Sequence, residues 1–196
     1  MRRAVTLIPQ GSPSRVQVLV ADPPWLFGDK LPRDRGASTR YPCLSFEQLC
    51  DFPIPDVGAD AILFLWKVEA IAETAYRLAH AWGFTPKAAL VWQKLTTNGL
   101  DHFGMGRYTR GSHETCIIAA RGRAFPDFKG QRSTFRARTP FDEGGKVEHS
   151  AKPDEFYAIV ERMYPSAIKH ELFARTVRPG WQQHGNELGR IPSRQG

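Results

Sequence analysis

The sequence predicts an α/β fold in which a mostly parallel β-sheet is covered by helices on both faces. Short apolar runs rich in β-branched residues recur along the chain, and stretches with the period of an amphipathic helix lie between them. The chain has 196 residues, 41% of them hydrophobic, with no internal repeat and no linker long enough to separate two domains. We therefore expect residues 1–196 to form a single domain with a substantial core.

Five apolar runs have the length and composition of buried strands. They are Val16–Ala21, Ala61–Trp66, Ala88–Trp92, Thr115–Ala120 and Ile168–Phe173. Because strands that alternate with helices pair mainly in parallel, we expect these runs to form one sheet with both faces buried.

Three segments are predicted to be helical. The first, SFEQL, has Ser45 as its N-cap and Gln48 as the capping-box partner. The second, residues 67–83, carries an apolar stripe and ends at a glycine. The third, KPDEFYAIVERMYP, places Pro153 in the first turn and a proline after its end.

Three segments do not fit this alternation of strands and helices, namely residues 26–44, 94–113 and 121–149. Irregular loops longer than about 12–15 residues in a compact domain usually carry function or are disordered. Each of these segments follows a predicted strand. In a parallel sheet we therefore expect all three to gather at the edge where the first strand ends.

The stretch VLVADPPWLFGD, residues 18–29, indicates a site at that edge. Asp22 is the first polar residue after the apolar run, at a position where open α/β sheets bind ligands. Pro23 and Pro24 stiffen the backbone and leave only carbonyl acceptors, and Trp25 adds a large indole. A flat ligand that donates hydrogen bonds suits this corner. The alternative is a strand end closed by a proline turn, in which Trp25 only packs.

The composition limits the class of protein. The formal net charge of +7 favours an acidic partner, most simply nucleic acid. The three cysteines form no CxxC pair and the histidines have no metal-ligand spacing, so we expect no disulfide framework and no metal. No apolar run approaches the ~20 residues of a membrane span, and the first residues lack the apolar segment of a signal peptide. We therefore expect a cytoplasmic protein.

Residues 121–138 combine cations with aromatic rings. The cations are Arg121, Arg123, Lys129, Arg132, Arg136 and Arg138, the rings are Phe125, Phe128 and Phe135, and Asp127 is the one acid. Because cations bind phosphates and rings stack on bases, this pattern favours a nucleic-acid contact. The alternative is a solvated basic loop whose phenylalanines lie in the core.

Charged residues in the C-terminal part have the character of a cofactor site. Lys152 stands directly before a predicted helix, where the helix dipole disfavours a cation unless it binds a carboxylate. Arg175 follows the last predicted strand, and Arg178 and the pair Asn186–Glu187 come shortly after. An acid and an amide past a strand end suit ribose hydroxyls. Taken singly, each of these residues is better explained as a surface residue.

Together these motifs resemble the catalytic subunit of the eukaryotic mRNA adenosine-N6 methyltransferase family and its bacterial and phage relatives. The matching motifs, in the family's order, are ADPPW, RYPCLSFEQL, ADAILFLW, AHAWGF, VWQK, GRYTRGSHETCIIAARG, SAKPDEFYAIVERMYP, KHELFAR and GWQQHGNEL. DPPW alone is shared with related amino-methyltransferases, whereas the ordered set is specific to this family. The resemblance implies a Rossmann-like fold dependent on S-adenosylmethionine (AdoMet), with a permuted order in which the catalytic corner comes early and the cofactor strand ELFAR late.

The resemblance also implies roles for individual residues. The catalytic corner that holds the target adenine would be Asp22, Pro23, Pro24 and Trp25. The cofactor contacts would be Asp22, Lys152, Phe173, Arg175, Arg178, Asn186 and Glu187. The family's substrate side corresponds to Tyr41 and Glu114, and the basic loops add Arg107, Arg110, His113, Arg132 and Arg136. Val177 and Glu187 replace a histidine and a glutamine of the mRNA enzyme, so those contacts differ.

The activity implied is methyl transfer from AdoMet to the exocyclic N6 of adenine in nucleic acid. Asp22 and the Pro23 carbonyl would accept the two N6 hydrogens, and Trp25 would stack on the base. A small lone domain similar to bacterial and phage members favours DNA over RNA, and a homodimer or a related partner subunit is an expected assembly. The alternatives are a catalytically silent methyltransferase-fold subunit that binds nucleic acid or a partner, and a cytosine-N4 methyltransferase.

Overall fold

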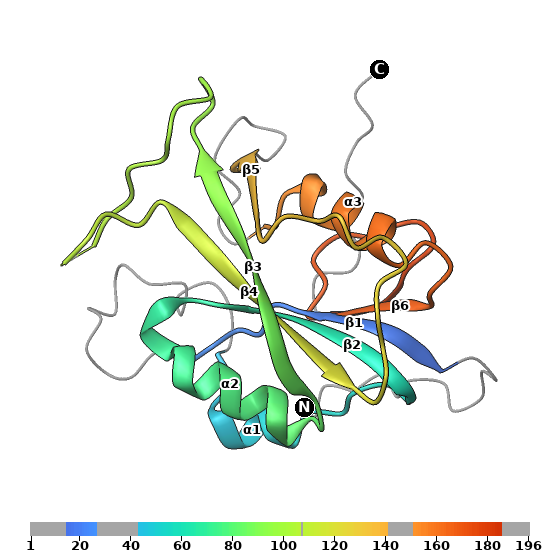
Figure 1. The fold of residues 1–196 in the computed structure, drawn as a ribbon. Coiled ribbons are helices and arrows are strands. Elements are labelled where there is room, and N and C mark those ends of the chain that lie inside the picture. The colour runs from blue at the N-terminus through green and yellow to red at the C-terminus, as the bar shows by residue number, and fades with distance from the viewer. Residues whose placement is uncertain (1–14, 27–42, 107, 141–150, 186–196) are drawn as a thin grey trace.

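The computed structural model describes residues 15–26, 43–106, 108–140 and 151–185. Within them the chain forms one sheet with the strand order β5-β3-β4-β2-β1-β6-β7 (Figure 1). The strands are β1 (Val16–Ala21), β2 (Val57–Lys67), β3 (Thr85–Leu95), β4 (His113–Arg121), β5 (Thr134–Arg138), β6 (Lys169–Leu172) and β7 (Gln182–His184). β4 runs antiparallel to its neighbours β2 and β3, and the other neighbouring strands pair in parallel. The predicted mostly parallel sheet is confirmed.

Helices lie on both faces of this sheet, as expected. α1 (Phe46–Cys50), η2 (Glu69–Ile71) and α2 (Ala72–Ala81) lie toward one face, and α3 (Asp154–Met163) covers the other (Figure 1). The capping box of α1 is present, because the Gln48 N–H donates to Ser45 Oγ at 3.2 Å and the Ser45 N–H donates to Gln48 Oε1 at 2.9 Å. Pro153 is the N-cap of α3 and not part of its first turn.

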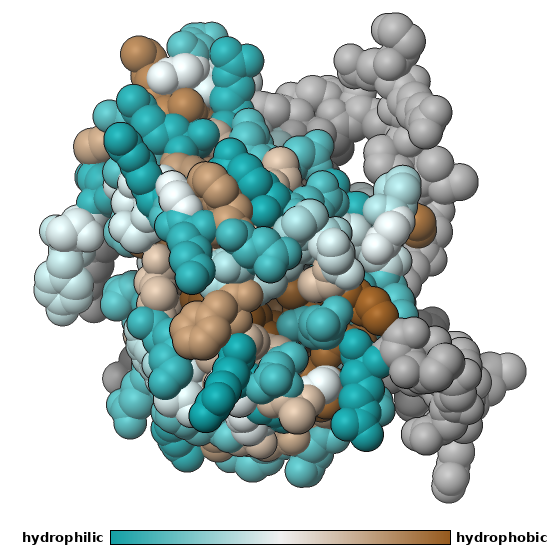
Figure 2. Space-filling view, turned by 45° about the vertical axis from the view of Figure 1, so that its right-hand side comes forward, coloured by the Kyte–Doolittle hydropathy of each residue, from teal (hydrophilic) through white to brown (hydrophobic). Residues whose placement is uncertain are grey.

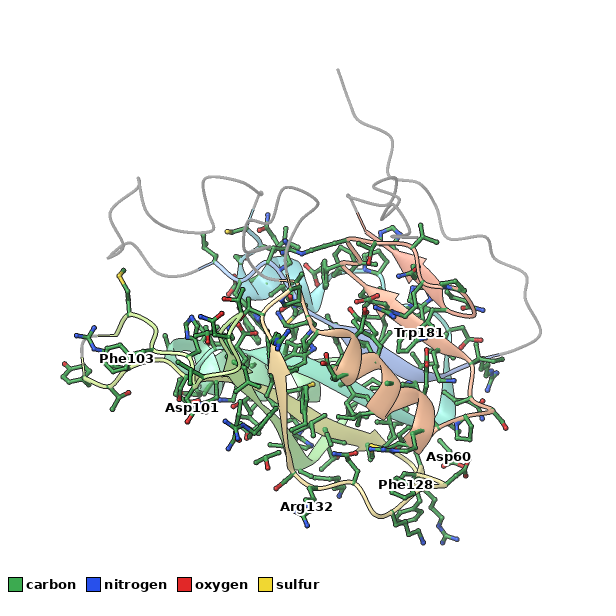
Figure 3. All side chains as sticks on the ribbon, turned by 90° about the horizontal axis from the view of Figure 1, so that it is seen from above. Asp60, Asp101, Phe103, Phe128, Arg132 and Trp181 are labelled. Atoms are coloured by element: carbon green, nitrogen blue, oxygen red, sulfur yellow. The ribbon has the colours of Figure 1, made fainter. Side chains whose placement is uncertain are left out.

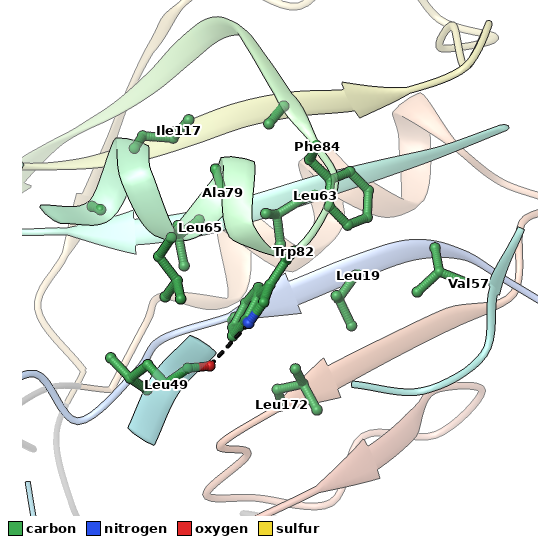
Figure 4. Packing of buried hydrophobic residues seen from close by; sticks show 14 of the residues in the cluster. Leu19, Leu49, Val57, Leu63, Leu65, Ala79, Trp82, Phe84, Ile117 and Leu172 are labelled. Carbon is green, nitrogen blue, oxygen red and sulfur yellow. Dashed lines mark hydrogen bonds between the residues drawn. The ribbon is translucent and has the colours of Figure 1, made fainter. Parts of the chain in front are cut away.

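The two faces of the sheet carry separate apolar clusters. Leu19 and Ala21 of β1 pack in the cluster that includes α1 and α2, whereas Val18 and Val20 pack in the cluster that includes α3. This division explains why the first strand reads as an unbroken apolar run, since both of its sides are buried. The Trp82 indole N–H donates to the Leu49 carbonyl at 3.0 Å and ties the end of α2 to α1 (Figure 4). Outside these clusters, hydrophilic side chains cover most of the face seen in Figure 2.

Two strands were not expected from the sequence. β5 lies inside residues 121–149, which we expected to be irregular, and β7 follows the last predicted strand. Both are short and polar, and β5 forms an edge of the sheet, so the continuous apolar run of a central strand is absent from their sequences. None of the helices in the described ranges is long and apolar enough to cross a membrane.

The expected gathering of all three long loops at the Asp22 edge is wrong for part of the chain. β1, β2, β3, β5 and β6 end at this edge, so the described residues between β3 and β4 do lie there. Because β4 is antiparallel, residues 122–133 leave the sheet from its opposite edge. Figure 3 accordingly shows Asp101 and Phe103 well away from Phe128 and Arg132. Residues 27–42 and 141–150 lie outside the described part of the chain.

The turn after β4 depends on a glycine. Gly122 has a φ of +62°, and an added Cβ would lie 2.2 Å from Asp60 Oδ1 and 2.4 Å from the Ala59 carbonyl oxygen. We expect Gly122→Ala to lower the free energy of unfolding by about 3 kcal/mol, from the left-handed backbone and the clash together. Gly180 has a φ of +78° but open space around it, so Gly180→Ala should cost only about 1 kcal/mol. Urea unfolding of both variants measures the difference, and equal losses would contradict it.

Candidate active site

A buried lysine joins the end of β1 to the start of α3. Lys152 Nζ lies 2.6 Å from Asp22 Oδ2 and 3.3 Å from Glu114 Oε2, and the lysine side chain is only 6% exposed. The other carboxylate oxygen of Glu114, Oε1, lies 2.5 Å from Lys94 Nζ. These four residues alternate in sign from Asp22 to Lys94, and we refer to them as the charge chain. A buried ion is tolerated when it is paired in this way.

The opposite charges of the charge chain favour the ionised forms of Lys152 and Glu114. Burial alone would lower the pKa of Lys152, but the carboxylates of Asp22 and Glu114 outweigh it, and the pKa is raised. Burial alone would raise the pKa of Glu114, but the charges of Lys152 and Lys94 outweigh it, and the pKa is lowered. At neutral pH the site therefore holds fixed charges in a largely desolvated position.

Backbone hydrogen bonds hold the DPPW corner, and the Trp25 side chain is packed into the core. Its side chain is 7% exposed, and its indole N–H donates to the Trp66 carbonyl at 3.2 Å. A ring held inside the core does not suit stacking on a substrate base, so the packing alternative fits Trp25 better. The Pro23 carbonyl accepts the Trp25 N–H at 2.8 Å, and the Pro24 carbonyl accepts the Leu44 N–H at 2.8 Å. These bonds fix the backbone next to Asp22.

A cavity of about 390 Å³ opens beside the charge chain, between α3 and the segment after β6. Five of the residues expected to bind the cofactor line it, namely Asp22, Lys152, Phe173, Arg175 and Arg178. The other two, Asn186 and Glu187, lie outside the described residues. The structure thus brings together residues separated by more than a hundred positions in the sequence, as a single small-molecule site would require.

Two residues of this cavity were missed by the sequence analysis. Glu171 is 7% exposed, accepts the Tyr157 hydroxyl at 2.6 Å and accepts Gln183 Nε2 at 3.0 Å. Burial raises the pKa of Glu171, and these two hydrogen bonds only partly oppose it. Burial also raises the pKa of the Tyr157 hydroxyl well above its usual value. The sequence signal that could have identified Glu171 was an acidic residue within KHEL. In the structure all four residues of this strand are buried.

Arg178 also lines the cavity. Its guanidinium lies 3.6 Å from the centroid of the Tyr157 ring and 2.8 Å from Asp154 Oδ1. Its Nε is buried and has no hydrogen-bond partner among the described residues. A buried donor of this kind next to a cavity points to a ligand acceptor.

The residues expected on the substrate side are dispersed. Glu114 lies in the charge chain, whereas His113, its neighbour along β4, points to the opposite face of the sheet. Arg110 is exposed and lies 5.1 Å from the centroid of the Phe103 ring. Arg136, which lies on the edge strand β5, forms an ion pair with Asp101 at 2.6 Å.

Arg132 lies at the end of the sheet opposite Asp22, because β5 starts there (Figure 3). It therefore does not join the candidate active site as we had expected. Tyr41 and Arg107 fall outside the described residues. No group of three or more His, Cys, Asp or Glu side chains in the described ranges is arranged to hold a metal ion.

The sequence is similar to that of known methyltransferases. The MT-A70 family model matches residues 16–187. The chain is 31% identical to the type II methyltransferase M.MunI of Mycoplasma sp, over 93% of this chain and 82% of that protein. It is 28% identical to an Arabidopsis thaliana N(6)-adenosine-methyltransferase MT-A70-like protein and 29% identical to the human N(6)-adenosine-methyltransferase catalytic subunit METTL3. These two alignments cover 89% of this chain but only 24% and 28% of the longer relatives.

The charge chain predicts a pH-dependent effect on stability. Glu114→Gln removes the carboxylate between two lysines, and we expect it to lower the free energy of unfolding by about 2 kcal/mol at pH 7. Because the folded-state pKa of Glu114 is lowered, its contribution is present above the unfolded pKa and is lost as the pH falls through the folded one. The difference from the wild type should therefore shrink below about pH 4.

Urea unfolding at pH 7 and at acidic pH measures this difference. The matched control is Glu73→Gln, an exposed position on α2, which should change the free energy of unfolding by less than about 0.5 kcal/mol. A loss for Glu114→Gln that does not vary with pH would contradict the electrostatic explanation.

Proposed function

The chain belongs to the MT-A70 family, and from that premise we propose that it transfers the methyl group of AdoMet to the N6 amine of adenine in nucleic acid, DNA in preference to RNA. The observation that carries this proposal is the Asp22 carboxylate, held by buried Lys152 at the side of the cavity. The preference for DNA rests on how much of each relative's length the chain matches. The chain matches most of the Mycoplasma type II methyltransferase but only about a quarter of the plant and human N(6)-adenosine-methyltransferases.

The cavity suits AdoMet in size and in charge. Its volume of about 390 Å³ falls in the usual range of small-molecule sites, ~300–1,000 Å³. AdoMet carries a carboxylate, an ammonium and a sulfonium, and the cavity lining offers both cations and carboxylates to meet them. Lys152 and Arg178 are the candidates for the carboxylate, and Arg178 has a buried Nε still to be paired within the described structure. Asp22 and Glu171 are the candidates for the positive groups.

When bound, AdoMet supplies an electrophilic methyl group, and the protein must make a weak nucleophile react with it. The lone pair of the adenine amine is delocalised into the ring, so the amine attacks poorly unless its geometry and charge are adjusted. The Asp22 carboxylate can accept an N6 hydrogen and stabilise the positive charge that develops on the nitrogen. Lys152 holds this carboxylate in one orientation, so little reorganisation is needed during the reaction.

The backbone of the DPPW corner supplies the second acceptor. The Pro23 carbonyl already accepts the Trp25 N–H, and a carbonyl oxygen has a second lone pair for the remaining N6 hydrogen. Trp25 supports this acceptor from within the core, where its indole N–H is bonded to Trp66. In this proposal the amine loses its proton after the N–C bond forms, and the target base must be unpaired or flipped out of a duplex.

The cytoplasmic location and a second copy or related subunit as partner stay predictions from the sequence.

The central test of the reaction uses Asp22→Asn, which keeps the shape of the side chain but removes its charge. We expect kcat to fall by about 10²–10³-fold, because the acceptor for the developing charge is weakened. Radiolabelled AdoMet is incubated with single- and double-stranded DNA and RNA oligonucleotides, and the modified nucleoside is identified by mass spectrometry. Asp127→Asn, on the opposite edge of the sheet, is the control and should be fully active.

The outcomes of this test separate the alternatives. N6-methyladenine made by the wild type and lost in Asp22→Asn supports the proposal, and the active oligonucleotide shows which nucleic acid is preferred. N4-methylcytosine as the product would replace adenine by cytosine as the target. AdoMet binding without any methyl transfer would favour the silent-subunit alternative.

Lys152 is expected to contribute to cofactor affinity as well as to the orientation of Asp22. Lys152→Met leaves Asp22 and Glu114 without their shared cation, so AdoMet binding should weaken by about tenfold or more. Lys152→Arg keeps a charge at this place and should retain part of the affinity. Calorimetric titration with AdoMet measures both variants, with thermal unfolding as a check of the fold. Unchanged affinity in a folded Lys152→Met protein would remove this residue from the cofactor site.

A further inference from the structure

The edge strand β5 carries cations at every second position on one side. Thr134, Arg136 and Arg138 are exposed, whereas Phe135 and Ala137 turn inward and pack in the cluster that contains α3. Arg132 continues the same spacing just before the strand and is also exposed. We call Arg132, Arg136 and Arg138 the arginine strip. At about 3.3 Å per residue, the strip spans roughly 20 Å along the edge of the sheet.

Neighbouring strands extend the polar character of this side toward the middle of the sheet. Arg136 lies next to Gln93 of β3, and Gln93 lies next to His113 of β4. Residues in register share a face, and Gln93 and His113 are both exposed. In Figure 1, β5 stands far from α1 and α2, and the exposures show that nothing in the described structure covers the strip.

The end of the strip adjoins the candidate active site. Arg138 and Thr139 line a shallow hollow together with Pro140 and Asp154. Pro140 and Asp154 also line the cavity next to Lys152. The strip therefore runs from the opposite end of the sheet to a surface that is continuous with the site.

We propose that the arginine strip binds the phosphate backbone of the nucleic-acid substrate and leads the strand to the Asp22 edge. This inference rests on the proposed function. The strand β5 contains no acid, and Arg136 has an ion-pair partner in Asp101, with both side chains more than half exposed. Such exposed pairs contribute little in water, so a phosphate can take the place of Asp101. Arg132 and Arg138 have no ion-pair partner within the described structure.

Charge and extent favour nucleic acid as the occupant. About 20 Å of duplex presents several phosphates of each strand, so one backbone can contact all three arginines. A protein partner that added a strand to this edge would meet a row of cations, which proteins use to prevent such pairing. Protection of the edge is the other explanation of the strip, and it predicts no effect on nucleic-acid affinity.

The test compares two triple variants with the same change in charge. Arg132→Gln/Arg136→Gln/Arg138→Gln removes the strip. The control, Arg77→Gln/Lys87→Gln/Arg162→Gln, removes three exposed cations that lie outside the strip and outside the predicted basic segment 121–138. Binding of a DNA duplex is measured by fluorescence anisotropy over a range of salt concentrations. The slope of log K against log salt is negative, and its magnitude should decrease by about 2–3 for the strip variant, at ~0.9 for each lost phosphate contact. For the control the slope should stay unchanged.

Further measurements make each outcome decisive. Arg132→Lys/Arg136→Lys/Arg138→Lys keeps the charges and should keep most of the slope, and circular dichroism checks that every variant is folded. AdoMet affinity of the strip variant should match the wild type. An unchanged slope in the strip variant, or an equal fall in both glutamine variants, would overturn the proposal even if the wild type methylates DNA. A wild type that neither binds nor methylates any nucleic acid would overturn the proposed function and the strip with it.

Discussion

The ammonium of Lys152, buried between the carboxylates of Asp22 and Glu114, is the contact around which the site is arranged. Its desolvation is unfavourable, and the two carboxylates compensate for it. The three side chains meet where the end of β1, the start of β4 and the start of α3 come together. The cavity, the fixed proline corner and the orientation of Asp22 all follow from that arrangement.

The antiparallel strand β4 separates the loops of the described chain between the two ends of the sheet. Because β4 enters the sheet from the Asp22 edge, Glu114 reaches the charge chain while the basic residues 122–133 leave from the far edge. β5 then runs back toward the Asp22 edge and carries the arginine strip with it. The candidate cofactor site and the arginine strip therefore lie on opposite faces of the sheet. They approach each other at the end of the sheet where β1 and β5 finish.

Much of this arrangement was predictable from the sequence, for reasons that differ between residues. Asp22 stands out because it follows an unbroken apolar strand, and α1 because its capping box is a local signal. The role of Trp25 was not predictable, because the sequence DPPW is compatible both with an indole packed in the core and with an indole that stacks on a base. Glu171 and β5 were missed for a related reason. The partners that bury Glu171 and the strand that pairs with β5 lie far away in the chain.

The bond between Asp22 and Lys152 joins residues 130 positions apart. Closing so long a loop has an entropic cost that only the assembled sheet can offset. The central strands must pair and α3 must dock before the two side chains meet. The position of the Asp22 carboxylate therefore depends on the assembled fold and not on the local sequence around it. A nascent or truncated chain that has formed only its first strands would carry every residue of DPPW and still be inert.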